Sequence, residues 1–152
     1  MRHAEKPKEG DNLSCAGLNR AMKLPAIITA KFGVPDYLYV ASPALGKVTK
    51  SGRMMQTAWP LAIKYNIAVN SRYPEEETRY LAENILKKSG TVIVIWEHRN
   101  IPSIITALGV NSGKLRWKND DFDSLWIVTI SGKKRTFTKD LQEIDPLENC
   151  TF

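Results

Sequence analysis

The run at residues 91–96 (TVIVIW) constrains the fold of this chain most, because it is the only continuous apolar stretch of note. An apolar run without alternation is typical of a strand that is buried on both faces, as in a parallel sheet covered by helices. The run is far shorter than the roughly 20 residues needed to cross a bilayer, and no signal-peptide apolar region precedes it. We therefore expect residues 91–96 to form an internal strand of an α/β protein.

Helical and strand patterns alternate along the rest of the chain. Apolar spacing predicts helices at residues 17–32, 51–65, 74–88 and 101–108, with Pro25 expected to kink or restart the first of them. β-rich runs predict further strands at residues 37–42 and 68–69, and a final hairpin from residues 125–130 and 135–138. This order predicts one domain spanning residues 1–152, a three-layer α/β/α sandwich around a central mixed, mostly parallel sheet.

The charge distribution favours a small anion as the ligand. The 152 residues carry 22 Lys and Arg against 16 Asp and Glu, a net charge of +6. The excess lies in the first hundred residues, and the basic residues are dispersed apart from Lys133, Lys134 and Arg135 at the predicted hairpin tip. A nucleic-acid or lipid surface needs a denser patch, whereas a buried anion pocket needs only two or three arginines. We therefore expect neither a nucleic-acid nor a membrane partner.

Four basic residues lie where a ligand would bind in such a fold, beyond the carboxyl ends of the strands. They are Arg2 and His3 at the start, Arg53 at a helix start, and His98 two residues after Trp96. A guanidinium group can donate two parallel hydrogen bonds to two oxygens of a phosphate, and an imidazole can attack phosphorus. Taken singly, each residue is more often structural. Together they indicate phosphoryl transfer without a metal or cofactor.

Motifs in the same order along nearly the whole chain resemble the histidine phosphatase superfamily, which has the phosphoglycerate-mutase-like fold. The WEH sequence is similar to that of a small phosphatase-like branch. The matching stretches are residues 1–7 (MRHAEKP), 13–21 (LSCAGLNRA), 53–58 (RMMQTA), 92–102 (VIVIWEHRNIP) and 121–126 (DFDSLW).

The resemblance implies a role for each basic residue. His3 would attack the phosphoryl group and become a phosphohistidine, which water would then hydrolyse. Arg2, Arg53 and His98 would bind the phosphoryl oxygens and stabilise the charge that builds on them. The resemblance also implies a carboxylic acid that protonates the leaving oxygen.

The proton donor is open among several acids. Glu77 or Glu76 is our candidate, because the run Glu75–Glu77 lies between the second arginine and the second histidine. These acids could instead merely favour a helix N-terminus. Glu5 and Glu97, which lie near the two histidines in the sequence, are alternatives.

Two departures from the family pattern affect the interpretation. Members have an apolar strand directly before the Arg-His pair, where this chain has only Met1. We therefore expect a truncated version of a longer natural chain, or a domain with an impaired pocket. The chain is also too short for the insertions that enclose the substrates of mutases and phytases, which favours a phosphatase of phosphorylated small molecules or phosphoproteins.

Other sites are poorly supported. Cys15 and Cys150 lie far apart without CxxC spacing, so we expect neither a disulfide framework nor a zinc site. No GxSxG elbow occurs, and residues 46–52 (GKVTKSG) lack phosphate-loop spacing. Asp120, Asp121 and Asp123 lack the glycine and closing glutamate of a calcium loop.

The sequence therefore predicts a metal-independent phosphomonoesterase that acts through His3, and we expect it in the cytoplasm. The alternative is a non-catalytic phosphate- or phosphoprotein-binding module on the same fold. Nucleic-acid binding through general basicity is a third interpretation, which the dispersed charge disfavours.

Overall fold

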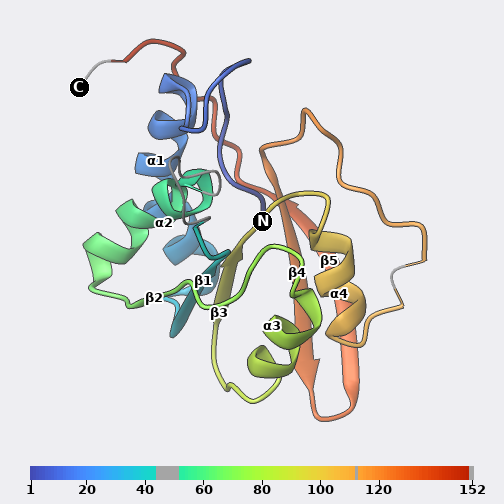
Figure 1. The fold of residues 1–152 in the computed structure, drawn as a ribbon. Helices are drawn as coiled ribbons and strands as arrows, with labels where there is room; N and C mark the ends of the chain where they lie inside the picture. The colour runs from blue at the N-terminus through green and yellow to red at the C-terminus, as the bar shows by residue number, and fades with distance from the viewer. Residues whose placement is uncertain (44–51, 112, 151–152) are drawn as a thin grey trace.

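The computed structural model describes residues 1–43, 52–111 and 113–150, and they form a mixed α/β structure (Figure 1). Its central sheet is parallel, with β1 (Tyr37–Val40) between β2 (Val69–Asn70) and β3 (Val92–Ile95). Residues 44–51, which include most of the sequence rejected as a phosphate loop, lie outside the described residues. The predicted alternation of helices and parallel strands is thus confirmed.

The carboxyl-terminal part forms the predicted hairpin as a separate antiparallel sheet. Its strands are β4 (Ser124–Ser131) and β5 (Lys134–Leu141), joined through Gly132. Gly132 has a φ of 57°, in the left-handed region that a tight hairpin turn requires and that glycine adopts without strain. Lys133 and Lys134 lie exposed at the tip, as the charge pattern indicated.

The helices among the described residues occupy the predicted places, with some changed bounds. They are α1 (Cys15–Phe32), α2 (Gly52–Tyr65), α3 (Thr78–Ile85) and α4 (Ile101–Ala107). Ser14 caps α1, since its Oγ accepts a hydrogen bond from the Gly17 amide at 3.1 Å. No described helix is both long enough and apolar enough to cross a membrane.

Two details of the expected elements are wrong. The third helix begins at Thr78 rather than at Pro74, because the residues just before it form a turn in which the Glu77 amide donates to the Pro74 carbonyl at 3.1 Å. The strand β3 is not buried on both faces: Val92, Ile93 and Val94 are half-buried, and only Ile95 is fully buried. One edge of β3 therefore lacks the cover that its apolar sequence predicts. Pro25 lies inside α1, which continues to Phe32 without restarting.

The core lies between the parallel sheet and its helices. Its fully buried members include Leu24 and Ile28 of α1, Leu38 and Val40 of β1, and Leu61 of α2. Close packing of this core fixes the carboxyl ends of β1 and β3 relative to the helix starts that follow them. Those ends carry the residues of the candidate site.

The start of α1 also packs tightly against the residues that follow His3. A Cβ atom at Gly17 would lie 2.1 Å from the carbonyl oxygen of Glu5, far inside van der Waals contact. The Ser14 amide donates to the same carbonyl at 3.0 Å. Only glycine at position 17 therefore permits this approach of helix and loop.

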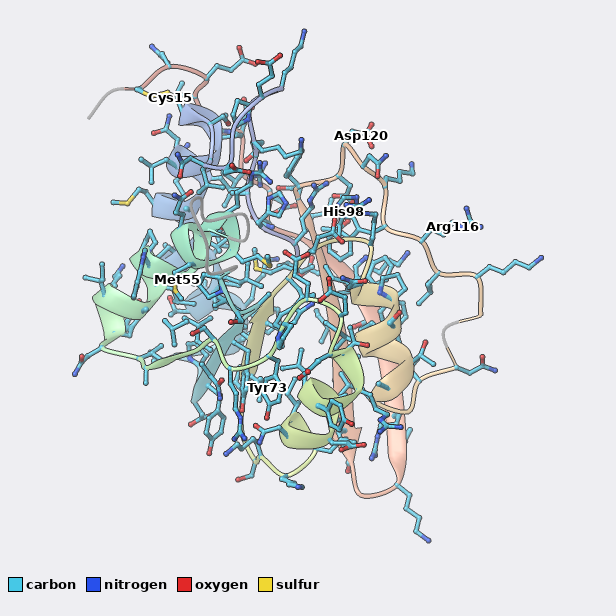
Figure 2. All side chains as sticks on the ribbon, viewed as in Figure 1. Cys15, Met55, Tyr73, His98, Arg116 and Asp120 are labelled. Carbon is cyan, nitrogen blue, oxygen red and sulfur yellow. A yellow bond between two sulfur atoms is a disulfide. The ribbon has the colours of Figure 1, made fainter. Side chains whose placement is uncertain are left out.

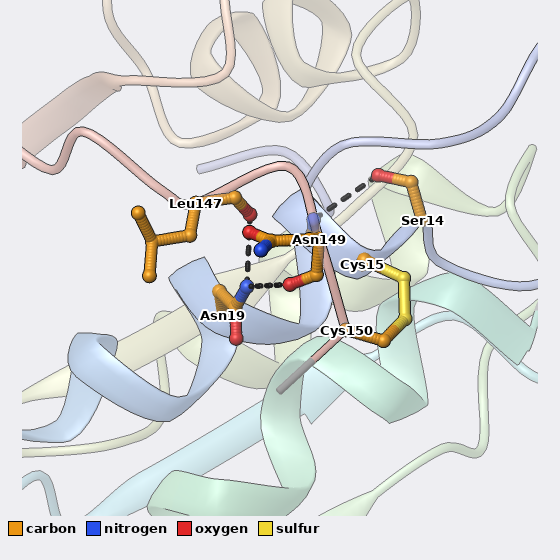
Figure 3. Close-up of a disulfide and its surroundings, with 7 residues drawn as sticks. Ser14, Cys15, Asn19, Leu147, Asn149 and Cys150 are labelled. Atoms are coloured by element: carbon orange, nitrogen blue, oxygen red, sulfur yellow. Dashed lines mark hydrogen bonds between the residues drawn. A yellow bond between two sulfur atoms is a disulfide. The ribbon is translucent and has the colours of Figure 1, made fainter. Parts of the chain in front are cut away.

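The expectation that Cys15 and Cys150 support no disulfide framework is wrong, because the two residues form a disulfide (Figure 3). A separation of 135 residues gives no sequence signal for such a bond, but the carboxyl-terminal segment returns to the start of α1. There Asn19 Nδ2 donates to the carbonyls of Leu147 at 2.8 Å and Asn149 at 3.1 Å. The disulfide and these hydrogen bonds hold residues 147–150 against α1.

Cys150→Ser should lower the free energy of unfolding by about 2–4 kcal/mol, because a disulfide that closes a long loop restricts the unfolded chain. Urea unfolding of both proteins without reductant measures this difference. With reductant, the two proteins should unfold at the same urea concentration. Equal midpoints under oxidising conditions would contradict the prediction.

Candidate functional site

Arg2 and His3 lie beside the end of β3 as a short parallel extension of the sheet. Arg2 pairs with Trp96, the Trp96 amide donates to the Met1 carbonyl at 3.0 Å, and the His3 amide donates to the Trp96 carbonyl at 3.3 Å. Both side chains are almost fully buried, with exposed fractions of 1% for Arg2 and 4% for His3. The sequence motif is therefore at the carboxyl edge of the sheet, where ligands bind in α/β folds.

The imidazole of His3 is held in one tautomer. Its Nδ1 lies 2.7 Å from the carbonyl oxygen of Ala4, and a carbonyl can only accept, so Nδ1 carries the proton. The Nε2 atom then bears the lone pair, and no described residue gives it a hydrogen bond. This orientation leaves a nucleophilic nitrogen available.

The pKa of His3 is lowered to about 4, first by burial and further by the positive charges of Arg2, Arg53 and His98, against the opposing hydrogen bond to Ala4. The geometry agrees, because Thr57 Oγ1 joins the Ala4 amide to the Arg53 carbonyl and Asn119 contacts both Arg2 and His98. His3 is therefore neutral at pH 7, as a nucleophile must be.

In the folded protein, His3 should remain neutral as the pH falls from 8 to 5 and should protonate near pH 4. Because the folded pKa is below the ordinary value of 6.5, the unfolded chain binds more protons between these values. The contribution of His3 to stability is present above pH 6.5 and is lost as the pH falls toward 4. NMR titration of the imidazole measures this directly, and a midpoint near 6.5 would refute it.

Arg2 is fixed by groups on the loop before β4. Its Nη1 donates to the carbonyls of Asn119 at 2.7 Å and Asp121 at 3.4 Å, and its guanidinium carbon lies 3.8 Å from the centre of the Phe122 ring. Burial lowers the pKa of Arg2 to about 10, against the opposing charges of Glu97 and Asp121, so the guanidinium stays charged at neutral pH. Its Nε is buried and has no hydrogen-bond partner among the described residues.

His98 also contacts the loop before β4. Its Nε2 lies 2.9 Å from Asn119 Oδ1, and Figure 2 shows it beside the loop that carries Asp120. Its Nδ1 lies 2.9 Å from Glu97 Oε1 but lacks the angle of a hydrogen bond, so the two groups form an ion pair only when the imidazole is protonated. Asn119 thus contacts both Arg2 and His98, and no sequence pattern singled it out.

Two buried nitrogen atoms at this site lack a hydrogen bond to any described residue. Among the described residues, Arg2 Nε and His98 Nδ1 are the buried side-chain polar atoms without a hydrogen bond. Buried polar atoms are nearly always satisfied, so a cluster of exceptions needs an explanation. An oxyanion bound beside these groups would offer acceptors.

Arg53 approaches from the start of α2. Its Nε donates to the Asn12 carbonyl at 3.3 Å, and its Nη2 donates to the Gly10 carbonyl. Thr57, one turn later, is fully buried; its Oγ1 accepts from the Ala4 amide at 3.0 Å and donates to the Arg53 carbonyl at 2.8 Å. Thr57 therefore ties the His3 segment to the helix that carries Arg53. Thr57 lies inside the matching stretch at residues 53–58, but no sequence pattern indicated this role.

The candidate acids differ in their exposure and in their contacts. Glu76 and Glu77 are exposed, and the carboxylate of Glu77 forms no hydrogen bond or ion pair with any described residue. The same segment nevertheless lies near the end of β3, because Trp96 Nε1 donates to the Glu75 carbonyl at 3.0 Å. Glu97, next to His98, has a side chain that is only 12% exposed.

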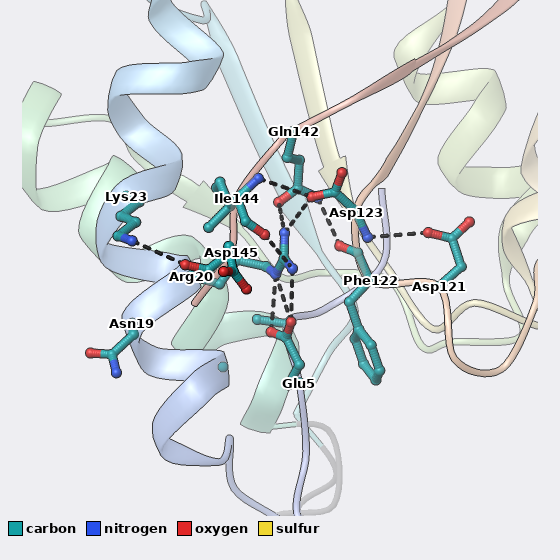
Figure 4. Close-up of polar contacts among 12 residues, drawn as sticks. Glu5, Asn19, Arg20, Lys23, Asp121, Phe122, Asp123, Gln142, Ile144 and Asp145 are labelled. Carbon is teal, nitrogen blue, oxygen red and sulfur yellow. Dashed lines mark hydrogen bonds and ion pairs between the residues drawn. The ribbon is translucent and has the colours of Figure 1, made fainter. Parts of the chain in front are cut away.

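Glu5 is committed to a structural network (Figure 4). Both of its carboxylate oxygens accept from Arg20 Nε, at 2.9 and 3.0 Å. The same guanidinium donates to Asp123 Oδ1 at 2.7 Å, Gln142 Oε1 at 3.1 Å and the Ile144 carbonyl at 3.0 Å. Arg20 therefore joins the segment after His3 to both ends of the β4–β5 hairpin, and Glu5 is not a free acid.

A scan against protein-family models finds no match to this chain, and a search of curated proteins finds none either. The functional assignment therefore depends on the geometry of the site and on the sequence motifs.

Proposed function

We propose that this protein is a metal-independent histidine phosphatase, a phosphoric monoester hydrolase of the small phosphatase-like branch of its superfamily. The observation that carries the proposal is the state of His3: neutral, fixed with its proton on Nδ1, and under the influence of Arg2, Arg53 and His98, which lower its pKa. A neutral nucleophilic nitrogen among three basic groups suits attack on a phosphate and little else.

In the proposed reaction, His3 Nε2 forms a bond to phosphorus while the ester P–O bond breaks. Arg2, Arg53 and His98 stabilise the charge on the phosphoryl oxygens, and the leaving oxygen takes a proton from an acid. Water then attacks the phosphohistidine, the P–N bond breaks, and inorganic phosphate and neutral His3 are released. Asn119 and the carbonyls of Gly10 and Asn12 now engage three of the basic groups, and the phosphate would replace these contacts.

The proton donor is proposed to be Glu77, which lies at the start of α3 on the segment that Trp96 contacts through Glu75. Glu97 is the alternative, because it is the acid nearest to His98. Separate Gln variants distinguish them: loss of the true donor should slow release of a poor alkoxide leaving group far more than release of nitrophenolate.

For the fold, we propose the three-layer arrangement of the phosphoglycerate-mutase-like class, in which Met1–His3 extends the parallel sheet beside β3. The pairing of Arg2 with Trp96 supports this placement. Substrates would be phosphorylated small molecules or phosphoproteins. A cytoplasmic location stays a prediction, and the Cys15–Cys150 disulfide weighs against it, because such bonds persist mainly in oxidising compartments.

The experiment is hydrolysis of 4-nitrophenyl phosphate in the presence of a chelator, with rapid quenching to trap the phosphoenzyme. We expect turnover to persist and a phosphoryl group, stable in alkali and labile in acid, to be found on His3. Turnover that is abolished by the chelator would contradict the mechanism. Stabilisation by inorganic phosphate without any turnover would instead establish the non-catalytic binding module.

A further inference from the structure

The loop before β4 carries three exposed cations on one side. Its residues 113–118 (GKLRWK) contain no acid. Leu115 is half-buried and Trp117 is buried, whereas the basic side chains between and around them are exposed. This alternation is that of an extended segment, in which successive side chains point to opposite sides. We call the three exposed cations the basic strip: Lys114, Arg116 and Lys118.

The inner side of this segment is anchored to the protein. Trp117 is only 6% exposed, its Nε1 donates to the Asp121 carbonyl at 2.8 Å, and its ring centre lies 4.7 Å from that of Trp126 on β4. Leu115 packs against the hydrophobic core. Figure 2 shows Arg116 on the same loop as Asp120. Because its backbone is held in this way, the segment has little freedom to lose when a ligand binds.

The cations of the basic strip are unpaired within the described part of the chain. None of the three forms an ion pair, hydrogen bond or ring contact with a described residue. By contrast, the exposed Arg99 beside the site pairs with Glu97 at 3.1 Å. The peptide groups of residues 115–117 also form no hydrogen bond with a described backbone group. Unpaired peptide groups with cations at alternate positions are suited to bind an extended, acidic peptide.

The basic strip ends at the candidate site. Asn119 directly follows Lys118; its carbonyl accepts from Arg2 Nη1 at 2.7 Å, and its Oδ1 lies 2.9 Å from His98 Nε2. The strip therefore begins beside groups that would bind the phosphate and continues away from them. Cations at every second residue of an extended segment lie about 7 Å apart along it, the spacing of alternate side chains in an extended peptide.

We propose that the basic strip binds acidic residues of a phosphopeptide whose phosphoryl group lies at His3, so that acidic phosphoproteins are the substrate class of this site. The inference rests on the function proposed above and selects one of its two substrate classes. Acids at alternate positions of the peptide would face Lys118, Arg116 and Lys114 in turn. Asp120, which is exposed at the site end of the strip, disfavours an acid directly next to the phosphorylated residue.

The test compares kcat/KM for three phosphotyrosine peptides at low ionic strength. One carries Asp at the third, fifth and seventh positions after the phosphotyrosine, one carries Asp at the same positions before it, and the neutral peptide has Asn at all of these positions. One acidic peptide should exceed the neutral one by at least about fivefold, because three exposed ion pairs act together. Salt at about 0.5 M should reduce this preference to within about twofold.

Two double variants with the same change in net charge separate the strip from general basicity. Lys114→Glu with Arg116→Glu should abolish the preference for the acidic peptide. Lys133→Glu with Lys134→Glu, at the exposed hairpin tip, should retain it. The preference is a ratio measured within each protein, so a general loss of activity cancels. Equal loss of the preference in both variants, or its retention in the first, would overturn the proposal.

Hydrolysis of 4-nitrophenyl phosphate by the parent protein reports on the proposed function alone. If this substrate is hydrolysed and neither acidic peptide is preferred, the basic strip has no such role. If it is not hydrolysed, fluorescence anisotropy of the same peptides tests the strip. Tighter binding of an acidic peptide that is lost in Lys114→Glu with Arg116→Glu would support the proposal, and equal binding of all three peptides would overturn it. Stronger binding of a single-stranded oligonucleotide than of either acidic peptide would also overturn it.

Discussion

His3→Ala should lower kcat for 4-nitrophenyl phosphate by at least about 10³-fold, because in the proposed mechanism the substitution removes the atom that bonds to phosphorus. Arg2, Arg53 and His98 remain in this variant, so an unreactive phosphate mimic such as tungstate should still bind within a few-fold of its original affinity. Steady-state kinetics in a chelator and calorimetric titration with tungstate measure the two quantities. Loss of turnover with retained tungstate binding would identify His3 as a nucleophile rather than as a binding residue.

Lys133→Ala provides the matched control, because Lys133 is exposed at the hairpin tip, away from the site. Its kinetics should equal those of the parent protein. Activity that survives His3→Ala but disappears in the chelator would replace this mechanism with a metal-dependent one.

Arg20→Ala should lower the free energy of unfolding by about 3–5 kcal/mol, because it leaves the carboxylates of Glu5 and Asp123 without their shared partner. The Arg20 side chain is only 5% exposed, and the ion pairs measure 2.8 Å to Glu5 and 2.7 Å to Asp123. Urea unfolding by circular dichroism measures the loss.

Arg79→Ala is the control for a surface ion pair. Arg79 and Glu83 form an i,i+4 pair at 3.5 Å in which both side chains are well exposed, so the change should be within about 0.5 kcal/mol. Similar losses in the two variants would show that the Arg20 network contributes no more than surface charge does.

The order of elements was predictable because it depends on local patterns. The helical spacing of α2 and the β-rich sequence of β1 are each contained in a short window, and the structure confirms both. The start of α3 was not predictable, because the Glu75–Glu77 run has the charges of a helix start but follows Pro74 in a turn. The half-exposure of β3 was missed for another reason: burial depends on the neighbouring strand, which local sequence does not describe.

The candidate site was also predictable only in part. Its basic residues were predictable because their chemistry and their positions after strands are visible in the sequence. The contacts that hold these residues were not predictable, since Asn119 binds Arg2 across 117 residues and Thr57 binds the Ala4 amide across 53. The disulfide joins positions still farther apart, and nothing in the spacing of its two cysteines indicates the pairing.

The contact between Gly17 and Glu5 has a consequence for how the chain can vary. Glu5 is two residues from His3, so this backbone contact helps to set the distance between α1 and the proposed nucleophile. Any larger residue at position 17 would displace the imidazole before it disturbed the hydrophobic core. Substitutions there should therefore move His3 relative to Arg2, Arg53 and His98 and impair the proposed activity.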